Sequence, residues 1–508
     1  MKNTNIKISA VFDYVIEIEG EFDYENNQLF CLENDPNTKV MVISATKNKA
    51  YCLGDKTADE YKVGQKVKPI EQSTTITTSS KLFGSVIDIF SNVLYSKNTN
   101  TSEYVYPNTS SAFNKPNQLM DYLPLNEQLN TGYKVIDLLI PIGRGQRELI
   151  IGDRKTGKSF IALNTIINQR NENVKNIYVM IGQQQNQVAS VYEMLDKYSA
   201  LNNTIIIYAP ADKPYQQYLA PYIGMAHAEN IAHEEDVLIV FDDLTTHANI
   251  YREMALLTNK PVGKEAFPGD MFFAHSRLLE RSGKFVNKKS ITALPIVQTV
   301  DNDITSLIAS NLISITDGQI VTNSNIFASN KLPAIDVDLS VSRIGGSVQK
   351  PHIAKSASEI KKIYTSYKRQ MKLSSLKYDL NDKTGSLILR GQLIERLFNQ
   401  KGVSLYSEKN TFLFSKMISW GLLEHINEVD LALKFLNVLI KENQIASSVF
   451  EQILSNTIKD EELAKDFFAF SLDQFAKAKN LKWKLKFNHD FVKFETEEFK
   501  NIVQLTGE

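Results

Sequence analysis

Residues 152–159 have the spacing GxxxxGK[ST], in which glycines at 152 and 157 are followed by Lys158 and Ser159. These residue types suit phosphate binding. Glycines let main-chain N–H groups approach phosphate oxygens, a helix amino terminus adds positive charge, the lysine reaches the outer phosphates and the hydroxyl ligates Mg²⁺. The pattern predicts a nucleotide-binding loop formed by Gly152, Asp153, Arg154, Lys155, Thr156, Gly157, Lys158 and Ser159. An ordinary glycine-rich turn is the alternative.

The sequence on either side of this loop predicts the elements that must position it. Residues 148–151 predict a buried strand before the loop. Apolar residues at helical spacing predict a helix after it, and these are Phe160, Ile161, Leu163, Ile166 and Ile167. A second apolar run, residues 237–241, ends at Asp242 and Asp243. Such a strand would place Asp242 beside the loop, where its carboxylate holds Mg²⁺ directly or through water. A helix-capping aspartate is the alternative.

Composition indicates an ordinary globular protein of several domains. The chain has 508 residues, 43% hydrophobic and 23% charged, with a formal net charge of −1, so no overall field favours nucleic acid or an anionic membrane. We expect no nucleic-acid partner. Two cysteines, Cys31 and Cys52, are too few for a secreted disulfide scaffold. The absence of a signal-peptide core and of a long apolar stretch predicts a cytoplasmic protein without membrane insertion.

Three regions follow one another along the chain. Residues 1–82 alternate with period two and predict a small antiparallel β-barrel. Residues 83–354 alternate short apolar runs with helical stretches, which predicts an α/β P-loop core with a mostly parallel sheet. Within them, residues 96–117 are rich in Ser, Thr, Asn and Pro and predict a loop. Residues 355–508 have few strand signals and predict an α-helical domain.

Five separate blocks of sequence resemble the alpha subunit of F-type rotary ATPases and ATP synthases. The blocks are PIGRGQRELIIGDR at 141–154, EAFPGD at 265–270, HSRLLER at 275–281, ITDGQ at 315–319 and VSRIGG at 341–346. The resemblance is dense from about residue 130 to 350 and thinner on either side. That family has an N-terminal barrel, a nucleotide domain and a C-terminal helical bundle, in agreement with the three regions.

The resemblance implies a hexameric ring of alternating alpha-type and beta-type subunits around a central shaft, with ATP or ADP and Mg²⁺ bound. Beta-type sites hydrolyse ATP, and alpha-type sites mainly hold nucleotide. Catalytic members have Gly-Glu after the strand that follows the P-loop helix, where this chain has Gly182 and Gln183. A glutamine amide can orient water but is a poor proton acceptor, so we expect this chain's own site to be non-catalytic. A solvated Gln183 without consequence is the alternative.

Arg343 matches the arginine that an alpha-type subunit inserts into the neighbouring catalytic site, and Ser340 lies in the same block as a supporting residue. A guanidinium placed there would bridge γ-phosphate oxygens, an effect worth about 10³ to 10⁵ in rate in related phosphoryl transfers. An ordinary surface cation is the alternative. The resemblance also leaves open a peripheral location at the inner face of the membrane.

The adenine end of the site matches the family less completely. Phe327 and Pro333 correspond to family residues near adenine, and Gln400 is a candidate third contact. Leu332, however, stands where the family has Arg. We therefore expect base recognition to be less well specified than phosphate binding.

Further departures favour a diverged member of the family. Lys155 stands in place of Gln, and Gln298 in place of a Glu near the metal. The helical segment from Met371 to Asp382 also looks shortened, and the barrel pattern begins by about Ile6. Such a ring could drive a surface or gliding machine. An ordinary ATP synthase alpha subunit, a hexameric RNA translocase and a purely structural ring subunit are the alternatives.

Overall fold

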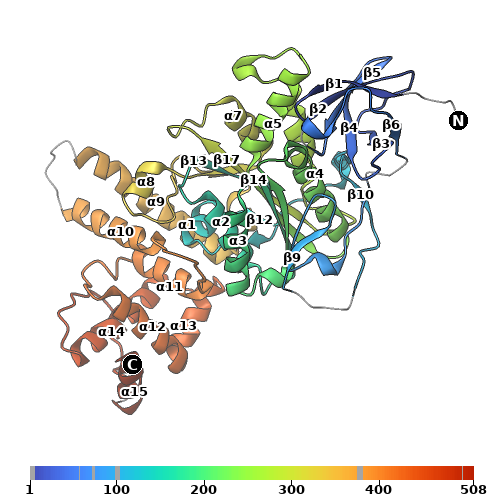
Figure 1. Ribbon diagram of the computed structural model, residues 1–508. Helices are drawn as coiled ribbons and strands as arrows, with labels where there is room; N and C mark the ends of the chain where they lie inside the picture. The colour runs from blue at the N-terminus through green and yellow to red at the C-terminus, as the bar shows by residue number, and fades with distance from the viewer. Residues whose placement is uncertain are drawn as a thin grey trace. The chain divides into compact units, whose positions relative to one another are not determined.

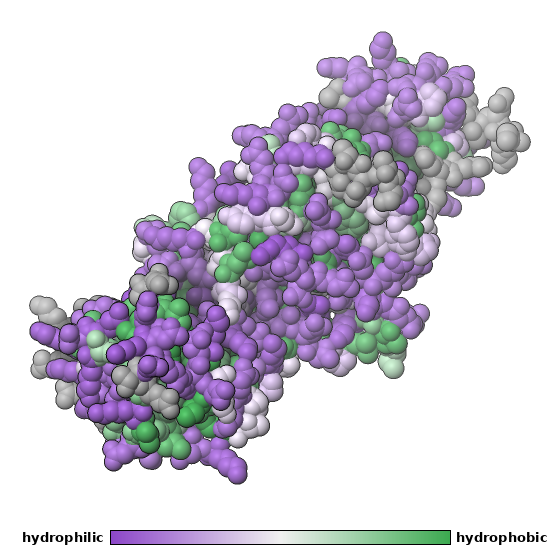
Figure 2. Space-filling view, turned by 90° about the horizontal axis from the view of Figure 1, so that it is seen from below, coloured by the Kyte–Doolittle hydropathy of each residue, from purple (hydrophilic) through white to green (hydrophobic). Residues whose placement is uncertain are grey.

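The computed structural model describes residues 6–56, 58–70, 75–97, 103–374, 382–494 and 496–507. Its contacts divide the chain into two compact units. The first unit contains Met1–Thr131 and Ile142–Ile344, and the second contains Gly132–Pro141 and Gly345–Glu508. Both predicted boundaries, at residues 82 and 354, remain predictions. Hydrophilic residues cover most of the surface that Figure 2 shows.

Antiparallel strands at the start of the first unit form a small barrel (Figure 1). They are β1 (Lys7–Phe12), β2 (Val15–Glu19), β3 (Leu29–Leu32), β4 (Lys39–Ala45), β5 (Lys49–Gly54) and β6 (Val67–Pro69), in the order β1-β2-β5-β4-β3-β6. A bridge between Lys7 and Lys66 joins the two ends of the sheet. Alternate residues such as Ile8, Ile16 and Phe30 fill the interior, because successive side chains of a strand point to opposite faces. The predicted barrel is confirmed.

The rest of the first unit is built on a nine-stranded sheet of order β19-β18-β13-β17-β16-β14-β15-β8-β9. The pairing is parallel from β18 to β8, and only the edge strands β19 and β9 are antiparallel. The strands are β8 (Ser85–Ile87), β9 (Val93–Ser96), β13 (Glu148–Asp153), β14 (Val174–Gln183), β15 (Thr204–Pro210), β16 (Asp236–Asp242), β17 (Ile291–Thr299), β18 (Gly318–Val321) and β19 (Val341–Ser342). The predicted mostly parallel sheet is confirmed.

Helices accompany these strands, as expected for a parallel sheet. They are α2 (Lys158–Asn168), α3 (Gln185–Lys197), α4 (Pro214–Ile231), α5 (Leu244–Leu257), α6 (Met271–Leu279), α7 (Leu307–Ile315) and α8 (Ser324–Ala328). The most enclosed is α4, whose residues from Tyr215 to Ile231 are all buried. Two short strand pairs complete the unit, namely β7 (Thr75–Ile76) with β10 (Ser110–Ser111) and β11 (Gln128–Leu129) with β12 (Ile142–Gly143). The pairing of β10 gives the predicted loop at 96–117 a short ordered stretch.

Within its described residues, the second unit contains helices and connecting segments but no strand. It contains α1 (Lys134–Leu139), α9 (Pro351–Ser374), α10 (Asp382–Phe398), α11 (Glu408–Ser419), α12 (Val429–Glu442), α13 (Gln444–Leu454), α14 (Glu461–Ala478) and α15 (Thr496–Gly507). The predicted helical region is confirmed. Most of the segment expected to be shortened, residues 371–382, lies outside the described residues. Asp137 fixes α1 within this unit, because its carboxylate accepts a hydrogen bond from Tyr406 Oη at 2.7 Å.

Lowering the pH should destabilise the first unit through His227. This imidazole is fully buried between Thr78 Oγ1 and Ser91 Oγ, and burial lowers its pKa from 6.5 to about 4. Above pH 6.5 the ring is neutral in the folded and unfolded chains alike. Below it only the unfolded chain takes up the proton, so this group should lower the free energy of unfolding by about 1.4 kcal/mol per pH unit until about pH 4.

Urea unfolding between about pH 7 and pH 5 measures this effect. The variant His227→Gln cannot titrate at this position. Its free energy of unfolding should therefore depend on pH less steeply than that of the wild type, by the slope that corresponds to about one proton taken up on unfolding. Equal slopes in the two proteins would show that His227 is not held neutral by the fold.

Candidate functional site

The phosphate-binding loop lies where the sequence predicts it, between β13 and α2. Gly157 is the N-cap of α2 with φ 91°, a value that glycine adopts without steric cost. A Cβ atom at Gly152 would overlap the main chain and hydroxyl of Thr322, which follows β18. The Thr156 hydroxyl lies 2.7 Å from that of Thr322 and 2.8 Å from the carbonyl oxygen of Asp153. The neighbouring strand β18 therefore helps to shape the loop.

Lys158 brings a positive charge into this loop. Its side chain is 6% exposed, and its ammonium donates to the carbonyl oxygen of Asp153 at 2.5 Å. Burial lowers the pKa of Lys158, and the carboxylates of Asp243, Asp242 and Asp153 oppose that shift. A partly desolvated cation next to free main-chain N–H groups suits a phosphate anion.

The Asp153 carboxylate forms hydrogen bonds to other parts of the protein. Its carboxylate accepts hydrogen bonds from the hydroxyl of Thr299 at 2.7 Å and from the main-chain N–H of Asn302 at 2.9 Å. These contacts tie the end of β13 to the chain that follows β17. The predicted nucleotide contact at Asp153 remains a prediction.

The two residues predicted to hold Mg²⁺ meet in the structure. Asp242 ends β16, and its carboxylate is hydrogen-bonded to the Ser159 hydroxyl and, at 2.7 Å, to Tyr178 Oη. Burial raises the pKa of Asp242, although these hydrogen bonds and Lys158 oppose the shift. A hydroxyl and a carboxylate in contact are oxygen ligands of the type that Mg²⁺ takes, so the residues present fit the ion.

Gln298 links the P-loop to the end of β16. The sequence did not reveal this link. Its Nε2 donates to Asp243 Oδ2, and its Oε1 accepts from Arg154 Nε at 2.9 Å. Asp243 also caps α5 by accepting from Thr246 N at 2.8 Å. An amide satisfies an anion and a cation together, whereas a glutamate would face Asp243 with a like charge. The only sequence feature that pointed to this bridge was the presence of Gln298 where the family has Glu.

Gln183 lies on the same edge of the sheet as the P-loop. It is the last residue of β14, in which Met180 pairs with Asp242 of β16. Its carbonyl oxygen accepts a hydrogen bond from Tyr208 Oη at 3.2 Å. Because parallel strands present their carboxyl ends at one edge, Gln183 lies at the edge that carries the P-loop and Asp242. Its role toward water remains a prediction.

The candidate adenine contacts belong to different units. Phe327 of α8 is 43% exposed, and Pro333 follows it in the first unit. Gln400 belongs to the second unit, where its amide accepts from Lys134 N at 2.7 Å and donates to Gly132 O at 3.0 Å and to Ser404 Oγ. Its role toward adenine remains a prediction.

Arg343 lies at the opposite end of the sheet from this chain's own P-loop. Ser342 pairs with Gly318, and Gly318 pairs with Glu148 at the beginning of β13. Asp153, at the P-loop end of β13, lies five residues beyond Glu148. Five residues correspond to about 17 Å along a strand. The antiparallel direction of β19 carries Arg343 further away still, and its N–H donates to Asp317 O at 2.9 Å.

The Arg343 side chain is exposed, and its guanidinium is held in place by hydrogen bonds to main-chain carbonyls. It donates to Thr316 O at 3.1 Å and to Ile313 O at 3.3 Å, which uses the free carbonyls at the end of α7. Ser340 is buried; its hydroxyl donates to Asp336 O at 2.6 Å and accepts from Val321 N at 2.9 Å. Ser340 thereby fixes the turn that presents Arg343.

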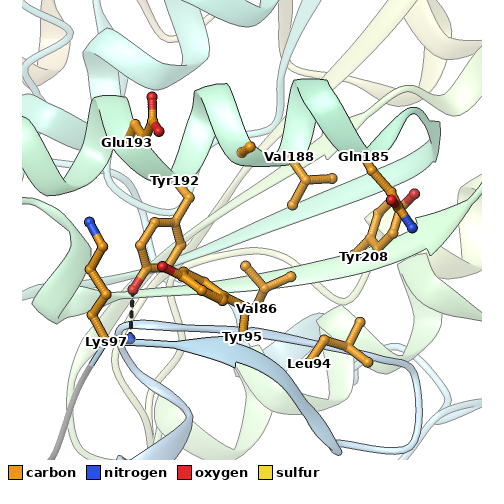
Figure 3. A pocket seen from close by; sticks show the side chains of 10 residues that line it. Val86, Leu94, Tyr95, Lys97, Gln185, Val188, Tyr192, Glu193 and Tyr208 are labelled. Carbon is orange, nitrogen blue, oxygen red and sulfur yellow. Dashed lines mark hydrogen bonds between the residues drawn. The ribbon is translucent and has the colours of Figure 1, made fainter.

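A further, apolar cavity of about 400 Å³ lies in the first unit. Figure 3 shows it between β9, which carries Leu94 and Tyr95, and α3, which carries Val188 and Tyr192. The amide N–H of Lys97 donates to Tyr192 Oη at 3.0 Å at one end. None of the predicted nucleotide or arginine residues lines this cavity.

Along the described stretches of chain, no helix is long and apolar enough to cross a membrane.

Comparison with known proteins agrees with this geometry. The sequence model "ATP synthase alpha/beta family, nucleotide-binding domain" matches residues 132–342, and the model "ATP synthase alpha/beta chain, C terminal domain" matches residues 349–473. The chain is 45% identical over 448 residues to ATP synthase subunit alpha 2 of Mycoplasmopsis pulmonis, which covers 88% of this chain and 87% of that protein. It is 38% identical over 475 residues to ATP synthase subunit alpha of Wigglesworthia glossinidia brevipalpis, covering 90% and 92%.

The two model matches span both units, and the first includes the P-loop and Asp242. The chain belongs to the ATP synthase alpha/beta family as an alpha-type, nucleotide-binding subunit of a rotary ATPase.

Proposed function

We propose that this chain is a non-catalytic subunit that supplies Arg343 in trans to the catalytic site of a neighbouring beta-type subunit. The position of Arg343 carries the proposal, because the residue is exposed at the end of the sheet remote from its own P-loop. An alternating hexamer brings that end of one subunit against the nucleotide of the next. The beta-type subunit and a central shaft are the partners of the chain in this proposal.

The planar guanidinium of Arg343 suits this task. It can donate two parallel hydrogen bonds to phosphate oxygens and so stabilise the charge that redistributes as the γ-phosphoryl group leaves. The carbonyls at the end of α7 hold it by hydrogen bonds to Thr316 and Ile313. Both contacts are to neutral carbonyl oxygens, so their exchange for phosphate oxygens breaks no ion pair at these two positions.

We propose further that this chain's own pocket binds Mg²⁺ with ATP or ADP and turns it over negligibly. Ser159 and Asp242 would hold the ion, which neutralises phosphate charge when bound. The loop and Lys158 would hold the phosphates, with Phe327 and Pro333 toward the base. Gln183 cannot accept a proton as a carboxylate can, so water beside the γ-phosphate would be positioned without being activated.

The ring that contains this chain would be specialised to drive another machine, such as a surface or gliding apparatus. The departures at Lys155, Gln298 and Leu332 support this proposal, as does the likeness to a protein named subunit alpha 2. Purification of the ring from its native cells and identification of its tightly bound chains would test the idea. Recovery of a complete proton-conducting membrane sector would favour an ordinary ATP synthase instead.

The isolated chain should bind nucleotide and hydrolyse it at well below about one turnover per second, the low end for competent enzymes. Lys158→Ala should weaken nucleotide binding to the isolated chain, since it removes the buried cation of the loop. The assembled ring with this variant should retain part of its ATPase activity, because its catalytic pockets belong to the partner. Fast hydrolysis by the isolated chain would contradict the non-catalytic assignment.

Arg343→Ala should lower the steady-state ATPase rate of the reconstituted ring by about 10³ or more. Arg343→Lys keeps the charge but loses the planar fork, and it should lose most of the same activity. Neither change should alter nucleotide binding to the isolated chain. Arg369→Ala, which removes an exposed arginine of α9, serves as the matched control and should leave turnover intact. Normal turnover with Arg343→Ala would exclude the role in trans.

A further inference from the structure

The chain between α14 and α15 carries four closely spaced lysines. Lys479, Lys482, Lys484 and Lys486, here called the lysine strip, are all exposed. The segment lies in the second unit, beyond residue 473, where the match to the family's C-terminal domain ends. Nothing in the proposed function of the ring accounts for it.

Side-chain exposure alternates along this segment as it does along a strand. Lys482, Lys484 and Lys486 are exposed, whereas the residues between them are buried or half-buried. Trp483 is 9% exposed, and its indole N–H donates to Glu428 Oε2 at 2.8 Å. Phe487 packs on Phe470 with ring centroids 5.8 Å apart. The apolar side chains therefore hold the segment in place with its lysines outward.

Both ends of the segment are also fixed by hydrogen bonds. Leu481 N donates to Ala476 O at 2.8 Å. Beyond the strip, Asp466 of α14 accepts from Asn488 N at 2.8 Å and from His489 N at 3.2 Å. The lysine strip is therefore presented on an ordered part of the molecule.

Lysines dominate the charge of this segment. Residues 474–489 contain five lysines and no Asp or Glu. Lys477 pairs with Asp473 at 2.6 Å, but within the described part of the chain the lysine strip forms no ion pair. Such a row of like charges repels itself, so an anionic partner laid along it would relieve that repulsion.

The main chain of the same segment is open. Residues 482–487 belong to no helix or strand, and across the described structure their main-chain N–H and C=O groups make no hydrogen bond. An edge of this kind is a template for pairing with a second extended chain. It distinguishes the segment from an ordinary solvated patch of lysines.

We propose that residues 482–487 form a docking edge for an acidic polypeptide strand of a partner protein. The added strand would pair with the open main chain, and its alternate Asp or Glu residues would face the lysine strip. Lysines two residues apart in an extended chain lie about 7 Å apart, which is the spacing of same-face residues on the added strand. Single-stranded nucleic acid fits less well, because Trp483 is buried and offers no stacking platform.

Binding of labelled peptides to the purified full-length chain, followed by fluorescence anisotropy, tests the proposal. The probe is a short peptide of alternating Glu and Thr. The matched peptide alternates Glu and Pro, which has the same charge but lacks the main-chain N–H of every second residue. We expect the Glu-Thr peptide to bind, and to lose about tenfold or more in affinity with Lys482→Ser, Lys484→Ser and Lys486→Ser combined. The Glu-Pro peptide should bind more weakly to the wild type by a similar factor.

A matched triple variant replaces three exposed lysines elsewhere in the second unit, Lys401, Lys434 and Lys459, with Ser. It should bind the Glu-Thr peptide as the wild type does, and thermal unfolding of both triple variants should be unchanged. Equal losses of peptide affinity in the two variants, or equal binding of the two peptides, would show that binding depends only on net charge. Either result would overturn the proposal. Tighter strip-dependent binding of oligo(dT) or of phosphatidylserine vesicles would overturn it as well.

Discussion

Parallel pairing of β13 with β17 on one side and β18 on the other is the constraint on which the site depends. Parallel strands place all their carboxyl ends at one edge. The P-loop, Asp242 and Gln183 are thereby gathered there from separate stretches of sequence. The antiparallel return of β19 carries Arg343 to the other edge. A slip of β18 by one residue would turn its buried side chains to the wrong face and misplace both Thr322 and Arg343.

Polar groups around the pocket are joined to one another. Tyr178 and Ser159 bind Asp242, and Gln298 joins Arg154 to Asp243. Burial of an unpaired charge costs several kcal/mol, so the buried Asp242 and Asp243 depend on their partners. The same logic holds far from the pocket, where the fully buried Arg281 forms a two-point ion pair with Glu229, each contact 2.9 Å long. The polar interior therefore fixes one arrangement of the elements as firmly as the apolar core does.

The sequence predicted the parts of the fold that local patterns determine. The strand before the P-loop, the helix after it, the barrel and the acidic end of β16 all follow from periodicity and residue type. It did not reveal contacts between residues far apart in the chain. Tyr178 Oη reaches Asp242 across 64 positions, and Gln298 reaches Arg154 across 144. The contacts of Gln400 with the main chain of Gly132 and Lys134 were likewise not foreseen, since side-chain amides take whichever partners the tertiary fold supplies.

The membership of α1 in the second unit has a consequence for how the chain can be divided. The polypeptide crosses between the units after residues 131, 141 and 344, so the second unit is not one continuous stretch of chain. Val135, Ile136 and Leu139 of α1 are buried. A fragment that stopped at residue 344 would keep this helix but lose its packing partners, and a fragment that began at 345 would lack the helix. Exchange of this unit between related proteins, whether by evolution or in the laboratory, therefore requires two coordinated replacements.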